Sequence, residues 1–161
     1  FFTVPGTAEQ NRGDAAMEAA ARTWGVDFAK KTGGGGTVWN GMTFDSETNR
    51  IYIGVGNAGA YDPTVRDPGS KGDNLYTSSI VALDADTGQV RWVFYTEGPV
   101  RVAPTVWDGR VYLGSDDGCV YCLDAAQGEL LWSHRPGLTD RRIPGNGRII
   151  SARPVRTATS M

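Results

Sequence analysis

Two cysteines, Cys119 and Cys122, are the first residues whose type and spacing suggest chemistry. A C-x-x-C pair is compatible with a redox couple, half of a zinc site or haem attachment. Haem attachment requires a histidine next, where the chain has Leu123, and a zinc site requires two further ligands, although His134 is the only histidine. In an alternating strand, positions i and i+3 face opposite ways. We therefore expect two buried structural thiols.

Acidic residues gather in two short segments that each end in glycine. Asp84 and Asp86 stand where a calcium loop would begin, but the closing glutamate of an EF-hand is absent at the expected distance. The pair Asp116-Asp117 is compatible with a paired-carboxylate or metal site. Because aspartate followed by glycine is also typical of tight turns, we expect both segments to be turns between strands.

A repeat explains where these turns lie. Residues 82–92 return forty positions later as residues 122–132, with Leu, Asp, Gly and Trp in register. Residues 50–54 return as residues 110–114, sixty positions later. Four short strands per period of about forty residues are typical of a β-propeller blade. The sequence predicts an all-β fold, a β-propeller fragment of about two four-stranded blades with one short N-terminal helix.

The repeat divides the chain into four expected parts. Residues 1–36 form the end of a preceding blade plus a helical and glycine-rich excursion, and residues 37–97 form the first blade with a 20-residue insertion. Residues 98–137 form the second blade, and residues 138–161 form a loop and the first strand of an incomplete blade. That loop contains Arg141, Arg142 and Arg148, which we expect to be solvated rather than to bind an anion.

Composition excludes several classes of function. The 161 residues carry a formal charge of -2, so no bulk field attracts nucleic acid. No apolar stretch approaches the roughly 18 residues that span a bilayer. The chain starts without an initiator methionine or a readable signal peptide, and we interpret it as a processed chain or an excised piece. Two blades cannot close a ring, so the expected partners are remaining propeller blades or further copies, four of which supply eight blades.

The repeat resembles the quinoprotein, or PQQ-dependent, alcohol dehydrogenases, whose eight-bladed propellers carry pyrroloquinoline quinone (PQQ) and usually calcium. Residues 82–92 are similar to the tryptophan docking motif of that family, and residues 99–161 resemble generic PQQ-like repeat proteins. Residues 1–95 carry consecutive landmarks of the type I alcohol dehydrogenases, among them Phe1-Phe2-Thr3-Val4-Pro5-Gly6, Gly33-Gly34-Gly35-Gly36-Thr37-Val38-Trp39-Asn40-Gly41 and Gly72-Asp73-Asn74-Leu75-Tyr76.

The resemblance implies three site residues and no catalytic one. It implies that Trp39 stacks on the quinone, that Thr37 hydrogen-bonds it and that Asn57 ligates calcium. An indole plane, a hydroxyl and an amide oxygen are chemically suited to these roles. The aspartate that serves the family as general base is missing, because the corresponding stretch, residues 95–104, contains only Glu97 as an acidic residue.

The resemblance therefore implies a periplasmic propeller fragment that ancestrally oxidised alcohols by hydride transfer to PQQ. We do not expect the chain to turn over substrate alone, because the catalytic aspartate segment and the ligands of earlier blades are missing. The alternative, from another class of function, is a non-catalytic β-propeller scaffold that binds proteins through its turns and edges.

Overall fold

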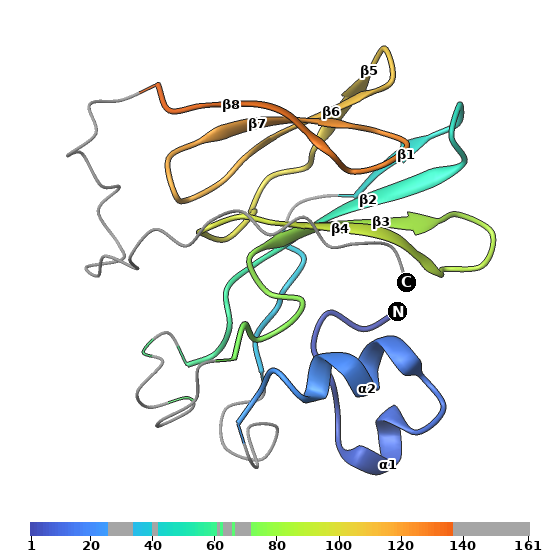
Figure 1. Ribbon diagram of the computed structural model, residues 1–161, viewed down its shortest axis with the longest axis vertical. Helices are drawn as coiled ribbons and strands as arrows, with labels where there is room; N and C mark the ends of the chain where they lie inside the picture. The colour runs from blue at the N-terminus through green and yellow to red at the C-terminus, as the bar shows by residue number, and fades with distance from the viewer. Residues whose placement is uncertain (26–33, 40–41, 61, 63–65, 67–71, 137–161) are drawn as a thin grey trace.

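The computed structural model describes residues 1–25, 34–39, 42–60, 62, 66 and 72–136. Within them, two antiparallel sheets of four strands each stack face to face, and two short helices lie on the opposite side of the first sheet (Figure 1). This arrangement confirms the predicted all-β fold of two four-stranded blades. The division of the chain into four parts stays a prediction.

The first sheet, blade 1, is a meander in which each strand pairs with the next along the chain. Alternating apolar residues and glycine turns favour such hairpins. A long connection, residues 56–78, joins its second and third strands. Its strands are β1 (Met42–Asp45), β2 (Arg50–Val55), β3 (Ser79–Asp84) and β4 (Val90–Tyr95).

The second sheet, blade 2, repeats this meander with a short connection at the equivalent point. The pairing of β3 with β4 shifts register between Ala82 and Leu83, and the equivalent pairing in blade 2 shifts between Cys122 and Leu123. The two blades therefore share the same register shift in their strand pairing. The strands of blade 2 are β5 (Thr105–Trp107), β6 (Arg110–Gly114), β7 (Val120–Asp124) and β8 (Leu130–His134).

In the described part of the chain, two helices precede the sheets. The predicted helix is α2 (Ala15–Ala21), whose N-cap Asp14 accepts hydrogen bonds from the Ala16 and Met17 amides. Met17 and Ala20 are buried in a cluster with residues of β2 and β3. The structure adds a helix that the sequence reasoning did not predict, α1 (Ala8–Asn11), which is a single turn closed by a capping box at Thr7.

The main core lies between the blades. Every second residue of a strand faces the same side of its sheet, so β2, β3 and β4 each direct buried side chains at blade 2. Burial of these side chains is the main force that holds the blades together. The buried cluster contains Tyr52, Ile80, Ala82, Trp92 and Phe94 from blade 1, Val100 from the link, and Val111, Leu113, Tyr121, Leu123 and Ala125 from blade 2.

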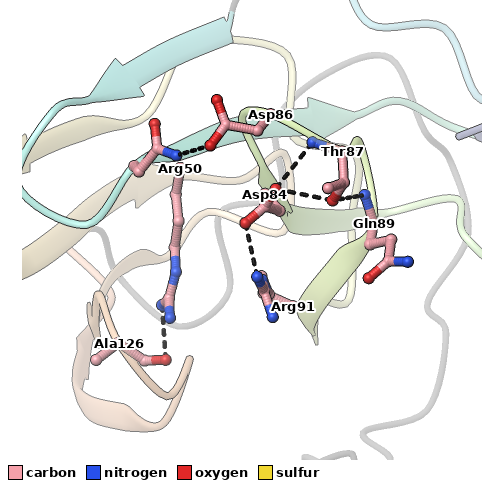
Figure 2. A network of polar contacts seen from close by, with 8 residues as sticks. Arg50, Asp84, Asp86, Thr87, Gln89, Arg91 and Ala126 are labelled. Carbon is pink, nitrogen blue, oxygen red and sulfur yellow. Dashed lines mark hydrogen bonds and ion pairs between the residues drawn. The ribbon is translucent and has the colours of Figure 1, made fainter.

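Three side chains of blade 1 converge on one turn of blade 2. The Trp92 indole Nε1–H donates to the carbonyl of Ala125 over 3.0 Å, and the Tyr52 hydroxyl donates to the same carbonyl over 3.1 Å. Arg50 Nη1 donates to the carbonyls of Ala125 and Ala126, each over 2.6 Å, and its bond to Ala126 is drawn in Figure 2. The tryptophan of the repeat therefore joins the blades by both packing and hydrogen bonding.

The first acidic segment is a turn, as expected. Asp84 Oδ1 accepts from the Thr87 amide over 2.9 Å and from its hydroxyl over 2.7 Å, while Asp84 Oδ2 accepts from Arg91 over 2.6 Å (Figure 2). These bonds, above all the one from Arg91, hold the pKa of the Asp84 carboxyl well below its usual range. Oδ1 is thus engaged within the turn and Oδ2 by β4, and the turn ends at Gly88 with a φ of +69°.

The two cysteines differ from each other more than we expected. Both are free thiols, and Cys122 in β7 is fully buried. Cys119 is only half-buried, because it lies in the hairpin before β7, where its amide donates to Asp117 Oδ1 over 2.8 Å. The expectation of two buried thiols is therefore correct for Cys122 and wrong for Cys119.

The parts of the chain that the structure describes contain no helix long and apolar enough to cross a membrane. The predicted basic loop and final strand, within residues 138–161, lie outside the described residues.

Candidate functional site

The segment that precedes blade 1 runs antiparallel to the end of β2 and its continuation. The Gly36 amide donates to the Asn57 carbonyl over 2.8 Å, and the Gly56 amide donates to the Thr37 carbonyl over 3.0 Å. A further bridge pairs Gly35 with Ala58. This ladder brings the predicted site residues Thr37, Trp39 and Asn57 to one place in the fold.

Glycine is required at Gly56 for this arrangement. A Cβ atom there would lie 2.8 Å from Nε1 of Trp39 and 2.9 Å from the carbonyl oxygen of Thr37. The indole of Trp39 therefore rests against backbone, although 56% of the residue remains exposed. A flat aromatic surface held in this way is a suitable platform for a planar ligand.

Arg101, in the link between the blades, completes the cluster. Its Cζ lies 5.9 Å from the centre of the Trp39 ring, within the range of a cation–π contact. Its Nη2 donates to Asn57 Oδ1 over 3.4 Å, and its Nε donates to the carboxylate of Asp116 in an ion pair. The site thus joins residues of both blades around one guanidinium.

The other two predicted residues contribute polar groups. Thr37 is exposed, so its hydroxyl is accessible from solvent. Asn57 is half-buried, and its Nδ2 donates to the carbonyl of Ala58 over 3.0 Å, which leaves Oδ1 directed at Arg101. Asn57 is therefore fixed in an orientation that presents its amide oxygen to a cation.

Sequence reasoning missed Arg101 and Asp116 as members of this site. Asp116 was expected to form only a turn, and Arg101 carried no motif. Arg101 lies 44 positions from Asn57 and 15 from Asp116, and it meets both only because the blades stack. The repeat in the sequence predicts that the two blades stack. It contains no pattern that would place Arg101 over the ring of Trp39.

The site fits a planar anion better than it fits calcium. An exposed indole with a guanidinium over its ring matches a flat ring that carries carboxylates, which is the chemistry of PQQ. Among the described residues, no three His, Cys, Asp or Glu side chains form a metal cluster. Asn57 supplies a single oxygen, and Arg101 already donates to it. Calcium takes six to eight oxygen ligands, so these residues do not build a calcium site by themselves.

Glu97, the acidic residue in the stretch of the missing base, is exposed at the end of blade 1. Its amide donates to Asp117 Oδ2 over 3.1 Å, a contact that links the two blades. Asp117 also accepts from the Tyr121 hydroxyl over 2.7 Å. This second acidic segment is a structural turn in which Asp117 organises the hairpin while Asp116 pairs with Arg101.

Comparison with known proteins defines the class. Residues 13–98 match the family model described as the glucose/ethanol/alcohol dehydrogenase beta-propeller domain, with PQQ as its short name. The match covers more than half of the chain, so the chain belongs to this family, and the resemblance to PQQ-dependent alcohol dehydrogenases is confirmed.

Particular relatives are quinohemoprotein alcohol dehydrogenases. ADH-IIG of Pseudomonas putida is 39% identical over 145 residues, which cover 81% of this chain and 20% of that protein. The enzyme of Comamonas testosteroni is 49% identical over 102 residues, covering 62% of this chain and 14% of its own length. The chain therefore spans about a fifth or less of the curated relatives that it matches.

Solved structures of quinohemoprotein alcohol dehydrogenases superpose on this chain. The Pseudomonas putida HK5 quinohemoprotein alcohol dehydrogenase ADHIIG superposes with a TM-score of 0.70 at 37% identity, over 84% of this chain and 22% of that one. The Comamonas testosteroni enzyme gives a TM-score of 0.68 at 36% identity, again over 84% of this chain and 22% of that one. A europium-containing methanol dehydrogenase shares the fold with a TM-score of 0.61 at 22% identity, over 82% of this chain and 26% of that one.

Proposed function

We propose that this chain supplies two adjacent blades and one wall of the quinone pocket to a periplasmic PQQ-dependent alcohol dehydrogenase. The observation that carries the proposal is the cluster of Trp39, Arg101 and Asn57, in which the Nε1 edge of an exposed indole rests on Gly56 and a guanidinium lies over the ring. The location is inferred from the family resemblance alone.

Each residue has a role that its position supports. Trp39 stacks on the planar ring, the exposed hydroxyl of Thr37 donates to a carboxylate of the ligand, and Arg101 offsets its negative charge. Bound PQQ would supply a two-electron acceptor for hydride from an alcohol. The residues of this chain would hold and orient the quinone.

A calcium site would need further oxygen ligands from outside the described residues. We propose that Asn57 contributes one oxygen ligand and that other blades contribute the rest. Arg101 must then release Asn57 Oδ1, since a guanidinium and a calcium ion repel each other at one oxygen. We also propose that the contact of Trp92 with Ala125 is the docking arrangement of the family and that further blades complete the ring.

Fluorescence tests the quinone pocket. PQQ titrated into the folded chain with calcium present should quench tryptophan emission saturably, and Trp39→Ala should remove that saturable component. Trp107→Ala is the matched control, because Trp107 is also exposed, at 66%, but lies at the far end of β5. Absence of saturable quenching in a folded sample at micromolar PQQ would refute the pocket.

A second candidate function is the non-catalytic scaffold. One observation favours it: the carboxylate of Asp116, which reaches Trp39 through Arg101, is held in an ion pair with that arginine. A scaffold would bind a partner protein with the same affinity in the presence and absence of PQQ. Quinone-dependent quenching that requires Trp39 would exclude a purely structural role.

A further inference from the structure

The guanidinium of Arg101 lies at the amide oxygen that the family resemblance assigns to calcium. Its Nη2 donates to Asn57 Oδ1 over 3.4 Å, and its Cζ lies 5.9 Å from the centre of the Trp39 ring. A guanidinium and a calcium ion are both attracted to the lone pairs of an amide oxygen, and they repel each other there. This chain therefore supplies a cation of its own at the position where the resemblance implies a metal ion.

Asp116 of blade 2 holds Arg101 in this position. Its carboxylate accepts from Arg101 Nε in an ion pair. Asp116 is fixed in turn, because its amide donates to the carbonyl of Pro99 over 2.9 Å and the hydroxyl of the neighbouring Ser115 donates to the carbonyl of Gly98 over 3.0 Å. Both carbonyls belong to the link between the blades, which also carries Arg101. The hairpin of blade 2 and the link therefore fix the two charged side chains relative to each other.

The bonds of Arg101 to Asp116 and to Asn57 differ in strength. The bond to Asn57 measures 3.4 Å, beyond the usual range of about 2.7–3.2 Å, whereas the bond to Asp116 joins two charged groups. A carboxylate of a ligand should therefore displace the amide oxygen of Asn57 and leave the ion pair with Asp116 intact. When the bond to Asn57 breaks, the guanidinium can move off the ring of Trp39 and remain beside it.

We propose that Arg101, positioned by Asp116, allows this chain to bind PQQ, a planar ligand with carboxylate groups, without a divalent cation. The guanidinium offsets the negative charge of the ligand, which a calcium ion would otherwise do. This inference rests on the quinone pocket proposed above. All the contacts that position Arg101 are made within the chain, so they do not depend on surfaces that further blades cover. Calcium held by further blades would add to the binding but is not required for it.

Tryptophan fluorescence tests the proposal in two buffers, one that contains calcium and one that contains an excess of the chelator EGTA. PQQ should quench the folded chain saturably in both buffers, with dissociation constants that agree within about twofold. Saturable quenching in the calcium buffer alone would overturn the proposal and leave the quinone pocket standing. Absence of saturable quenching in both buffers would overturn the pocket and the proposal together.

Variants of Asp116 test its role as a positioning residue. Asp116→Asn should weaken PQQ binding in EGTA by about two- to tenfold, because the ligand must then order a guanidinium that is no longer held in place. Charge alone predicts the reverse, since the loss of a carboxylate strengthens the attraction to an anion. Asp116→Glu keeps the carboxylate and should recover part of the affinity. Asp108→Asn is the matched control, because Asp108 is exposed at the opposite end of β6 and asparagine tolerates its φ of +49°.

The variants give a result that charge alone would not produce. Weaker binding in Asp116→Asn, partial recovery in Asp116→Glu and unchanged binding in Asp108→Asn would support positioning by Asp116. Binding in Asp116→Asn that is as tight as in wild type, or tighter, would overturn it. Circular dichroism establishes that each variant is folded. The comparison of the two buffers uses wild type alone, so it tests the proposal whatever the stability of the variants.

Discussion

The ring of Trp92 lies so close to Gly128 that a Cβ atom at Gly128 would be 2.5 Å from Trp92 Cδ2. The equivalent glycine of blade 1, Gly88, has the same left-handed conformation and open space around it. Gly88 and Gly128 therefore have the same backbone conformation, but only Gly128 contacts a tryptophan. Substitutions at Gly88 and Gly128 can therefore separate two free-energy costs: that of disturbing the contact between the blades and that of backbone strain in the turn.

Alanine at these glycines should give unequal losses of stability. Gly88→Ala places a Cβ in the left-handed region and should cost about 1–2 kcal/mol of unfolding free energy. Gly128→Ala adds the displacement of Trp92, and overpacking of this kind costs a further ~1–3 kcal/mol. Urea denaturation of both variants measures the difference. Equal losses would mean that Trp92 does not rest on Gly128.

Removing the indole N–H of Trp92 should lower the free energy of unfolding less than removing the whole ring. Trp92→Phe leaves the Ala125 carbonyl with its bonds from Tyr52 and Arg50, so we expect a loss of about 1 kcal/mol. Trp92→Ala opens a cavity between the blades and should cost about 3–5 kcal/mol. Urea denaturation compares both with Trp107→Ala, an exposed site that should change stability by less than about 0.5 kcal/mol. A Trp92→Ala loss as small as that of Trp107→Ala would contradict the packing.

The repeat made the blades predictable, because propeller strands are short, local and marked by glycine turns. Residues 82–92 and 122–132 show the same spacing, and the structure places both at the hairpin between the last two strands of a blade. Helix α1 was not predicted because four residues carry too little periodicity. Cys119 was misplaced because its half-burial depends on where β7 begins, and strand boundaries are set by tertiary contacts.

The candidate site was predictable only in part. Thr37, Trp39 and Asn57 were named through the resemblance, and the ladder between Gly36 and Asn57 brings them together. Arg101 could not be named, because its position over Trp39 depends on how the blades stack. A contact that depends on stacking leaves no local pattern in the sequence.

The Asp84 turn should make stability depend on acid pH. The bonds from Arg91 and Thr87 lower the folded-state pKa of Asp84 below the unfolded value of about 3.9. The stabilisation is therefore fully present above the unfolded pKa and is lost as pH falls through the folded-state pKa. Urea midpoints of wild type and Asp84→Asn should differ at pH 7 and converge in strong acid. A gap that stays constant down to pH 2 would show that charge is not its cause.

Arg101 should matter more for ligand binding than for folding. Its ion pair with Asp116 is about one-third exposed, with side-chain exposures of 33% and 31%, and such pairs contribute less than about 1 kcal/mol. Arg101→Gln should therefore fold normally but bind PQQ about tenfold more weakly, because a charged hydrogen bond is lost. Arg101→Lys should recover part of the affinity and lose the forked geometry. PQQ titration measures all three proteins, and unchanged affinity in Arg101→Gln would remove Arg101 from the pocket.

The two thiols should react at different rates. Cys122 is fully buried, so it should be modified only when blade 2 unfolds. Cys119 is half-buried, and burial, reinforced by the charge of Asp117, raises the pKa of its thiol. Cys119 should therefore react slowly at neutral pH and faster as pH rises, because the thiolate is the reactive form. A disulfide reagent applied to wild type, Cys119→Ser and Cys122→Ser follows each thiol separately. Fast modification of Cys122 in folded Cys119→Ser would contradict its burial, and equal rates in urea would establish that the fold causes the difference.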